Sequence, residues 1–503
     1  MADTKREIER KYESDESGLP DLTGVAGVRA VIDKGVANLD AVYYDTPDER
    51  LAKASITLRR RTGGSDAGWH LKVPVAPGVR DEIHEPLSDT VPRTLAGLVR
   101  SRVREAELLP VVRLRSDRDL RHLVDAEGAL LAEVSVDAVH AERLADGGGT
   151  AQWTEIEVEL ADGGDPAFLD QVEKRLRKAG VRPSSSASKL ARALAETAPK
   201  KSKKRKAPPA PDEPRTAGDH VLAYVRAQRD AILELDPAVR QDAYDSVHRM
   251  RVATRRLRST FRSYGKVLDR TVTDPVGEEL KWLASELGVD RDREVMTERL
   301  TTVLAELPRT LVSGPIRTRM RTWANARRGG SRRRLIGVLD SQRYLALLDT
   351  LDALVAEPPL LPAAAGKPEK VIGKAVRKDF GKVSALVEKA IAAPPGADRD
   401  LALHEARKKA KRTRYAAEAA TPALGEPARG LAKSMKSLTS LLGEHQDSVM
   451  VRETLRELSA VAHAAGESSF TYGVLYGREE QRAAAVEAAL PAMWEEIGSG
   501  VSG

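Results

Sequence analysis

The stretch KREIERKY at residues 5–12 alternates charged and bulky side chains with the two-residue period of a β-strand. One face of this strand carries Glu7, Glu9 and Lys11, and the opposite face carries most of the bulk. A charged strand face normally points to water, and it points into a protein only where other charges compensate it. The orientation of this face therefore decides what kind of fold surrounds it.

The residues that follow, as far as Leu160, show mostly the same two-residue alternation, interrupted by turn signals. Candidate strands lie at residues 7–12, 54–61, 68–73, 80–87, 111–117, 129–139 and 153–160. Helices are expected near 92–106 and 166–179, both beginning at a proline. Many strands with few helices predict an α+β domain built on a closed or strongly curved antiparallel sheet.

Charges occupy one face of most of these strands, and the two signs cluster by strand. Carboxylates include Glu133, Asp137, Glu155, Glu157 and Glu159, and cations include Arg59, Arg61, Lys72, Arg113 and Arg115. A half-solvated sheet with cross-strand ion pairs explains any single strand, but it explains the recurrence less well. A closed sheet with these faces inward would need charged contents. Carboxylates bind Mg²⁺ or Mn²⁺, and rows of Arg and Lys bind phosphate oxygens, so a metal-bound polyphosphate satisfies both.

The motifs of this region also fall in a familiar order. The E-x-E-x-K sequence of Glu7, Glu9 and Lys11 is followed by YYDTPDERL, SITLRRR, GWHLKVP, RDEIHEPL, VSVDAV, TEIEVEL and SSSASKLARAL. Over residues 3–197 this ordered set resembles the CYTH family, the triphosphate tunnel metalloenzymes. The resemblance implies an eight-stranded antiparallel tunnel that binds a triphosphate with a divalent metal and hydrolyses a phosphoanhydride bond.

The resemblance also implies roles for individual residues. The implied metal-binding carboxylates are Glu7, Glu9, Glu155, Glu157 and Glu159, with Mg²⁺ or Mn²⁺ as the cofactor. The implied phosphate ligands are Lys11, Arg59, Arg61, Lys72, Arg115 and Lys189. Glu82 and Asp137 match acidic catalytic positions that assist the metal or orient water. No G-x-x-x-x-G-K-[ST] loop, G-x-S-x-G elbow or H-E-x-x-H pair competes with this chemistry.

The composition changes at residues 198–218, which read APKKSKKRKAPPAPDEPRTAG and are typical of an extended linker. We therefore expect one domain at 1–197 and another at 219–503, the first with an acidic excess and the second with a basic excess. The net charge of the whole chain is +7. The KKSKKRK run also fits a nuclear signal or a nucleic-acid tail, in addition to a solvated linker.

Several classes of protein are disfavoured by the composition. The chain has no cysteine, which excludes disulfides and thiolate metal sites. It has no apolar run long enough to cross a bilayer, and charges throughout its first twenty residues argue against a secretory signal. A cytoplasmic location without a membrane partner is the expectation.

Beyond Asp219 the apolar period becomes helical, and two segments carry a stripe of cations. The stripe of residues 246–264 comprises His248, Arg251, Arg255, Arg258 and Arg262. The stripe of residues 403–418 comprises His404, Arg407, Lys411 and Arg414. Surface helices usually intersperse acids at i,i+4, and these stripes largely lack them, which favours an anionic partner over a merely solvated face. The two histidines also fit a role in helix packing.

The two stripes belong to an internal duplication. Each histidine is followed 39 or 40 residues later by an LG sequence, whose glycines are Gly288 and Gly443, and four residues further on by Asp292 and Asp447. Matching landmarks at matching spacing predict an all-α region of duplicated helical bundles, with repeats at about 219–356 and 368–497.

This arrangement resembles the CHAD domain, a conserved histidine α-helical domain often fused behind a CYTH domain, over residues 219–497. The resemblance implies a basic groove that binds inorganic polyphosphate. The implied ligands are His248, Arg251, Arg255, Arg256, Arg258, His404, Arg407, Lys411, Arg412 and Arg414. Nucleic acid is disfavoured as the target, because aromatic residues make up only 4% of the chain and offer few stacking platforms.

The sequence thus predicts a metal-dependent hydrolase of inorganic triphosphate whose C-terminal domain binds polyphosphate, in the cytoplasm or on polyphosphate granules. One alternative is a polyphosphate-binding protein, targeted to granules, whose tunnel senses rather than catalyses. Another is a nucleotide-acting CYTH enzyme, either an adenylate cyclase or a thiamine or nucleoside triphosphatase. The sequence leaves the preferred triphosphate, the choice between Mg²⁺ and Mn²⁺ and the oligomeric state open.

Overall fold

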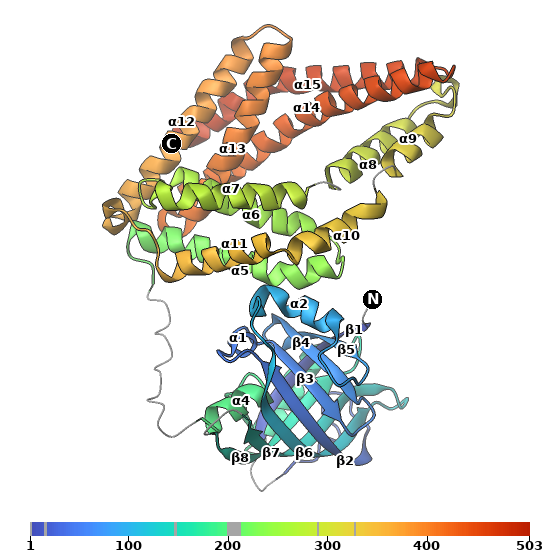
Figure 1. Cartoon of the computed structure of the whole chain (residues 1–503), viewed down its shortest axis with the longest axis vertical. Coiled ribbons are helices and arrows are strands. Elements are labelled where there is room, and N and C mark those ends of the chain that lie inside the picture. The colour runs from blue at the N-terminus through green and yellow to red at the C-terminus, as the bar shows by residue number, and fades with distance from the viewer. Residues whose placement is uncertain are drawn as a thin grey trace. The chain divides into compact units, whose positions relative to one another are not determined.

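The computed structural model describes residues 3–14, 18–144, 148–198, 213–288, 291–325 and 328–502. Most of the predicted linker lies outside this set. The chain divides into two compact units, Met1–Pro209 and Ala210–Gly503, and each is described by itself. The first unit is built around strands and the second of helices (Figure 1), which confirms the predicted fold class. Among the described helices, none combines the length and the apolar character needed to cross a bilayer.

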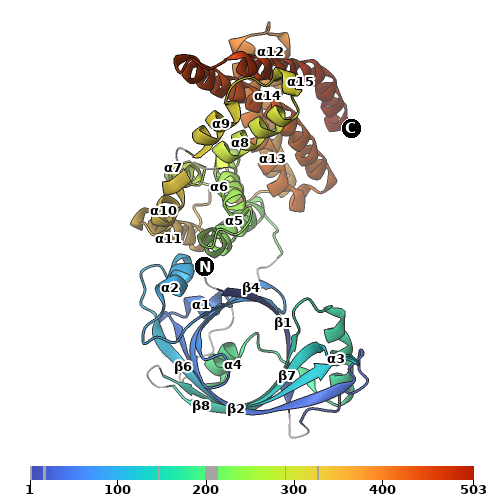
Figure 2. The same ribbon diagram turned by 90° about the vertical axis from the view of Figure 1, so that its right-hand side faces the viewer.

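The N-terminal unit is an antiparallel barrel. Its strands are β1 (Asp3–Ser14), β2 (Ala30–Asp45), β3 (Thr57–Thr62), β4 (Gly68–Ala76), β5 (Val79–Glu85), β6 (Leu109–Val124), β7 (Leu130–Arg143) and β8 (Thr150–Leu160). They follow the order β5-β4-β3-β2-β6-β7-β8-β1, and pairing of β1 with β5 closes the ring (Figure 2). The two-residue strand β9 (Arg182–Pro183) is added to β1. The predicted eight-stranded tunnel is confirmed.

Two strands differ from the prediction. Strand β2 was not among the candidate strands, because Gly35 interrupts its alternation at a register shift between Asp33 and Val36. Gly35 has a positive φ of 84°, which an L side chain rarely adopts. Strand β6 continues beyond the predicted end at residue 117, so its inner face gains residues that sequence reasoning assigned to no strand.

Helices α2 (Arg93–Val103) and α3 (Ala167–Lys178) cover apolar side chains on the outer face of the barrel. The other helices of this unit are α1 (Arg50–Lys53) and α4 (Lys189–Glu196). Val172 and Leu176 of α3 pack in one cluster with Val158 of β8, and Leu95 of α2 packs in another with Leu71 of β4. Because alternate residues of a strand point to opposite faces, burying these apolar residues outside turns their charged neighbours inward.

Part of the barrel interior is apolar, and α4 fills it. Leu190 and Ala193 of α4 pack against Val139 and Trp153 on the inner faces of β7 and β8. Figure 2 shows α4 inside the ring of strands. The side chain of Ser188 caps the first turn by accepting a hydrogen bond from the backbone N–H of Ala191 at 3.1 Å. The cap fixes the start of α4 at the next residue, Lys189.

The C-terminal unit consists of helices. They are α5 (Ala217–Arg240), α6 (Ser246–Ser263), α7 (Arg270–Glu286), α8 (Arg291–Ala305), α9 (Ile316–Asn325), α10 (Arg328–Leu339), α11 (Gln342–Ala356), α12 (Pro368–Ala392), α13 (Ala397–Leu424), α14 (Glu426–Ala464) and α15 (Phe470–Ser502), with short 3₁₀ turns at Arg309–Leu311 and Pro362–Ala365. In the first repeat, α6 contacts α5 and α7; in the second, α13 contacts α12 and α14; and α6 also contacts α13.

The same glycine–arginine contact occurs once in each repeat. A Cβ at Gly288 would lie 2.6 Å from Nη2 of Arg251, and a Cβ at Gly443 would lie 3.3 Å from Nη2 of Arg407. Each LG glycine therefore gives room to the guanidinium of the first arginine of the stripe in its own repeat. The recurrence agrees with the predicted duplication. The side chain of Asp292 lies outside the described residues, so the matching of Asp292 with Asp447 stays a prediction.

Candidate functional site

A cavity inside the barrel is lined almost wholly by charged and polar side chains. They are Glu7, Glu9, Lys11, Tyr43, Thr57, Arg59, Arg61, Asp66, Lys72, Arg80, Glu82, Arg118, Glu157, Glu159, Ser188 and Lys189. They come from β1, β2, β3, β4, β5, β6, β8, the segment between β3 and β4, and the start of α4. The charged face of KREIERKY thus points into the barrel, where both signs of charge meet it.

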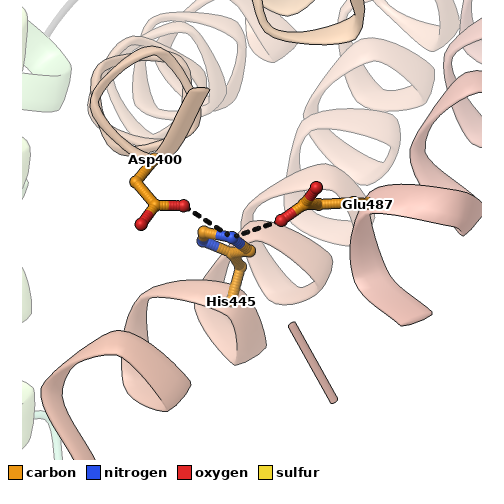
Figure 3. Close-up of side chains that lie close together, drawn as sticks. All are labelled: Asp400, His445 and Glu487. Carbon is orange, nitrogen blue, oxygen red and sulfur yellow. Dashed lines mark hydrogen bonds and ion pairs between the residues drawn. The ribbon is translucent and has the colours of Figure 1, made fainter. Parts of the chain in front are cut away.

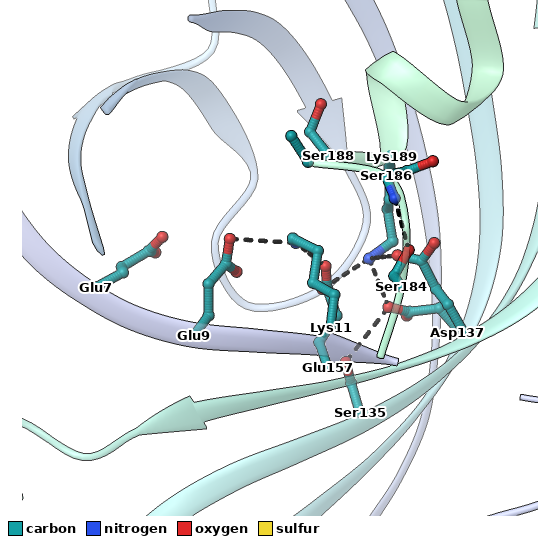
Figure 4. A network of polar contacts seen from close by, with 12 residues as sticks. Glu7, Glu9, Lys11, Ser135, Asp137, Glu157, Ser184, Ser186, Ser188 and Lys189 are labelled. Carbon is teal, nitrogen blue, oxygen red and sulfur yellow. Dashed lines mark hydrogen bonds and ion pairs between the residues drawn. The ribbon is translucent and has the colours of Figure 1, made fainter. Parts of the chain in front are cut away.

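Lys189 occupies the centre of a cluster of three carboxylates (Figure 4). Its Nζ lies 2.9 Å from Asp137, 2.7 Å from Glu155 and 2.6 Å from Glu157. Burial alone would lower the pKa of Lys189, but the charges of Asp137 and Glu157 outweigh burial and raise that pKa. The three carboxylate oxygens are also close enough to one another to share one metal ion.

Two more lysines bridge carboxylates on the β1 side of the cavity. Lys11 lies between Glu9, at 3.2 Å, and Glu157, to which it donates a hydrogen bond. Lys72 donates to Glu7 at 2.5 Å. Cations therefore separate the carboxylates of β1 from those of β8, and the buried charges neutralise one another in pairs.

Glu82 is the meeting point of a further group. Its carboxylate lies 2.8 Å from Nδ1 of His70 and 3.7 Å from both Lys72 and Arg59. Arg59 also donates to the phenolic oxygen of Tyr43 at 3.3 Å. These contacts hold Arg59 and Lys72 with their charged ends in the cavity.

The two carboxyl groups of Glu7 and Glu82 differ in their pKa. Burial, together with a hydrogen bond to Glu82, raises the pKa of Glu7 to about 8. Burial opposes ionisation of Glu82 too, but the hydrogen bond of His70 and the charge of Lys72 hold its pKa below the usual range. The two carboxyl groups thus drive their pKa values apart, and a cation bound to Glu7 would lower its pKa again.

The structure brings most of the predicted tunnel residues together. Glu7, Glu9, Lys11, Arg59, Arg61, Lys72, Glu82, Glu157, Glu159 and Lys189 line the cavity. Asp137 and Glu155 reach it through Lys189. Glu159 lies farther along β8, bound to Lys5 at 2.7 Å.

Arg115 is the exception, and its predicted inward orientation is wrong. Its side chain is 51% exposed and lies 4.0 Å from Asp40 on the outer face of β6. Arg118 lies on the inner face instead, and it donates to Asp137 at 2.7 and 2.9 Å and to Glu157 at 3.1 Å. The charged residues 113–121 at odd positions form an ordinary solvated face, so the more charged face of β6 is not the buried one.

Sequence reasoning also passed over other lining residues. They are Tyr43, Thr57, Asp66, Arg80 and Ser188. Arg80 could have been found, because it shares a strand face with Glu82, two residues later, and in the structure it lies 3.8 Å from Glu9. Tyr43 could not, because β2 gave no strand signal.

The described residues fit a divalent cation in part. Asp137, Glu155 and Glu157 form one group of oxygen donors, the kind that Mg²⁺ and Mn²⁺ prefer. Glu7 and Glu9, which the sequence placed in the same metal site, lie on β1, the strand that pairs with β8, and Lys11 lies between Glu9 and Glu157. A cation bound to this group requires Lys189, whose Nζ lies within 2.9 Å of all three carboxylates, to move aside. A cation shared with Glu9 requires Lys11 to move as well.

In the C-terminal unit, the two cationic stripes meet. We use the term inter-repeat basic cluster for Arg251 and Arg255 of α6 together with Arg407 and Lys411 of α13. Burial lowers the pKa of Lys411 to about 8, and the charges of Arg407, Arg255 and Arg251 contribute in that order. Asp447 raises that pKa to a smaller extent than Arg255 lowers it. Positive charge is thus concentrated where the two repeats join.

Three other predicted polyphosphate ligands are in ion pairs with acids. Arg256 and Arg414 lie 3.0 and 2.8 Å from Glu418, and Arg412 lies 2.6 Å from Asp379. Arg256 thereby ties α6 to α13. Arg412 ties α13 to α12, whereas Arg414 and Glu418 both lie in α13. These ion pairs leave less of the charge of the three arginines for an external ligand.

The remaining predicted ligands differ in exposure. His248 is exposed, whereas His404 is half-buried, with Nδ1 at 2.5 Å from Oε1 of Gln446. Arg258 is half-buried, and burial and the nearby charge of Arg262 lower its pKa.

A closed barrel filled with paired carboxylates and cations defines the N-terminal unit as a metal-dependent triphosphate tunnel. The chain belongs to the CYTH–CHAD fusion proteins: a CYTH domain matches residues 5–194 and a CHAD domain matches residues 223–456.

Known proteins are similar to the whole chain or to a part of it. An uncharacterised protein from Mycobacterium tuberculosis (strain CDC 1551 / Oshkosh) is 40% identical over 492 residues, which cover 94% of this chain and 92% of that protein. PptA from Streptomyces chartreusis is 21% identical, with a TM-score of 0.47, and covers 56% of this chain and 100% of its own. The CHAD domain from Ricinus communis is 22% identical, with a TM-score of 0.43, and covers 56% of this chain and 92% of its own.

The carboxylate cluster around Lys189 can be tested by Lys189→Met, which leaves three buried carboxylates facing one another. We expect the free energy of unfolding of the N-terminal unit to fall by about 3–5 kcal/mol, because breaking a buried ion pair leaves its partners uncompensated. Urea unfolding measures the change. Adding Mn²⁺ should restore part of the loss, since the ion replaces the ammonium charge.

Lys178→Met is the matched control, since Lys178 is exposed on α3, and it should change the free energy of unfolding by less than about 0.5 kcal/mol. If Lys189→Met has wild-type stability, or if Mn²⁺ does not change its stability, Lys189 does not compensate the three carboxylates as described.

Proposed function

We propose that this protein hydrolyses inorganic triphosphate in the barrel with Mg²⁺ or Mn²⁺, and binds inorganic polyphosphate through the helical unit. The observation that carries the first part is the cavity itself, where cations from five strands and from α4 face carboxylates inside a closed ring. A triphosphate oxygen accepts from Lys or Arg, and a metal–triphosphate complex presents both signs of charge to such a wall.

In this proposal the cationic side chains bind the phosphate and the carboxylates bind the metal and water. Arg59, Lys72 and Arg118 bind and orient the phosphate oxygens, and the ion pairs that they now form with carboxylates position them beforehand. Glu155 and Glu157 of β8, together with Glu7 and Glu9 of β1, would hold the metal, which would neutralise phosphate charge and lower the pKa of bound water. Glu82 is kept ionised by His70 and Lys72, so it can accept a hydrogen bond from an attacking water and orient it; its lowered pKa makes it a weak base.

An inorganic substrate fits the lining better than a nucleotide does. Among the lining residues that the structure describes, Tyr43 is the one aromatic side chain, and its hydroxyl is bound to Arg59. A purine or pyrimidine is usually held by stacking on aromatic or apolar surface, and this cavity offers neither. The leaving group is therefore inferred to be phosphate or pyrophosphate.

The inter-repeat basic cluster supports the second part of the proposal. Like charges brought together by burial repel one another, and an anion that fills the space between them relieves the repulsion. A phosphate chain without metal is bound by cations alone, which the inter-repeat basic cluster provides, whereas the tunnel contains both cations and carboxylates. Association with polyphosphate granules in the cytoplasm would follow from this binding.

Hydrolysis is tested with the purified full-length chain, tripolyphosphate and Mn²⁺. We expect Glu7→Gln/Glu9→Gln to lower phosphate release by about 100-fold or more, because both metal-side carboxylates of β1 are lost. Glu127→Gln/Asp162→Asn removes two exposed acids of the same domain and should leave the rate unchanged. ATP and thiamine triphosphate, assayed in parallel, should be poorer substrates.

Equal phosphate release from the wild type and from Glu7→Gln/Glu9→Gln would remove the tunnel mechanism. Tight tripolyphosphate binding by the wild type without phosphate release would identify the tunnel as a sensor. Preferred turnover of ATP or thiamine triphosphate would replace the inorganic substrate with a nucleotide-type one.

Polyphosphate binding is tested by changing Arg251, Arg255, Arg407 and Lys411 to Gln. The four changes should weaken affinity and reduce the slope of log affinity against log salt by about one for each cation that no longer pairs with a phosphate, by analogy with nucleic acids. The control changes Arg270, Lys281, Arg343 and Arg429 to Gln, since these exposed cations are already paired with acids. Equal affinity in the two quadruple variants would refute the cluster as the binding site.

The pH dependence of polyphosphate binding follows from Lys411. Because its pKa is about 8 in the free protein and a polyanion favours the ammonium form, affinity should be full below pH 8 and fall as pH rises through it. The loss reaches about tenfold one pH unit above the pKa. Lys411→Arg should abolish the fall between pH 7 and pH 9 in a titration of binding, whereas Lys436→Arg, an exposed lysine on α14, should preserve it.

A further inference from the structure

A second charged cluster lies in the C-terminal unit, and it differs in composition from the inter-repeat basic cluster. Asp400 of α13, His445 of α14 and Glu487 of α15 point toward one another (Figure 3). Nε2 of His445 lies 3.4 Å from Oδ1 of Asp400 and 3.3 Å from Oε1 of Glu487. One potential donor atom from each residue lies within 4.8 Å of the other two.

Hydrogen bonding alone satisfies this group poorly. Nε2 of a histidine carries at most one hydrogen, so it cannot donate a linear bond to both carboxylates at once. Charge-assisted N–H···O bonds are usually about 2.7–2.9 Å long, and both distances here exceed that range. The imidazole is nevertheless buried, with 2% of its side chain exposed, where a weakly satisfied polar group is costly.

Metal coordination accounts for the same distances. Zinc ligands lie about 2.1 Å from the ion, which puts two ligand atoms about 3.4 Å apart at the tetrahedral angle. Both contacts of His445 already have this separation. The nitrogen and the two carboxylate oxygens converge from three different helices, as the protein ligands of a three-residue zinc site do.

The surroundings fix one ligand and leave access to another. Arg399 lies 2.6 Å from Oε2 of Glu487 and also donates to the carbonyl of Ala393 at 2.8 Å, so it orients Glu487 with the other oxygen toward His445. Such support by a second layer of residues is typical of metal sites. Asp400 is 34% exposed, which gives an ion and a water ligand a route from solvent.

We propose that Asp400, His445 and Glu487 bind one divalent transition-metal ion, of which Zn²⁺ is the best fit. A mixed nitrogen and oxygen donor set favours Zn²⁺ over Mg²⁺, in contrast to the all-oxygen donors of the tunnel. The ion would join α13, α14 and α15. It would also stabilise the region of His404, which lies one turn after Asp400 on α13 and contacts Gln446, the residue next to His445.

The competing account is a protonated His445 held between two carboxylates as a purely structural ion pair. That account predicts no ion. It also predicts that changing His445 lowers stability by the same amount with and without metal.

The test measures Zn²⁺ bound to the full-length chain after EDTA treatment and dialysis against limiting Zn²⁺, by elemental analysis and calorimetry. The comparison is made in the Glu7→Gln/Glu9→Gln background, which weakens the tunnel as a competing site. We expect His445→Gln to bind one Zn²⁺ fewer per chain than its parent, with affinity at this site reduced at least about 100-fold. His463→Gln, an exposed histidine on the same helix, should bind as the parent does.

Thermal unfolding provides the second measurement. Zn²⁺ should raise the melting temperature of the parent and of His463→Gln, but not of His445→Gln, because an ion that binds only the folded state stabilises it. If His445→Gln fails to fold, Asp400→Asn, at a partly exposed position, replaces it in both measurements with the same expected results. Equal Zn²⁺ content in parent and His445→Gln, or a melting temperature of the parent that Zn²⁺ does not change, would overturn the proposal.

Discussion

Pairing of β1 with β8 on one side and β5 on the other is the constraint on which the N-terminal unit depends. It closes the sheet, and closure leaves the charged face of β1 no access to bulk water except through the tunnel. The apolar faces are covered from outside by α2 and α3, so a flipped strand would expose them. The interior charges are stable because each meets its opposite, most clearly at Lys189.

The two units use charge in opposite ways. In the barrel, carboxylates and cations neutralise one another. In the helical unit, Arg256, Arg412 and Arg414 are paired with acids, and in the inter-repeat basic cluster the charges of Arg407, Arg255 and Arg251 lower the pKa of Lys411. Gly288 and Gly443 let the guanidinium groups of Arg251 and Arg407 approach the backbone closely.

Charge clusters in this chain therefore have to be judged by their partners. Gln446 and His445 are neighbours on α14. Gln446 contacts His404, whereas His445 lies between two carboxylates. Gln446 therefore borders the cationic stripe of α13, and His445 belongs to a group with the donor atoms of a metal site. Stability of α13 and α14 connects the two, since both helices contribute to each.

Periodicity in the sequence determined a good part of this structure. It predicted the strand face of Glu7, Glu9 and Lys11, the row of Glu155 and Glu157, the helices covering the barrel, and the duplication marked by His248 and His404. Only the tertiary structure decided which face of β6 is buried, and so exchanged Arg115 for Arg118. It also decided which of the predicted polyphosphate-binding arginines form ion pairs with Glu418 and Asp379. The reason is physical: a period assigns side chains to faces, but the energy of a buried charge depends on partners that only folding brings near.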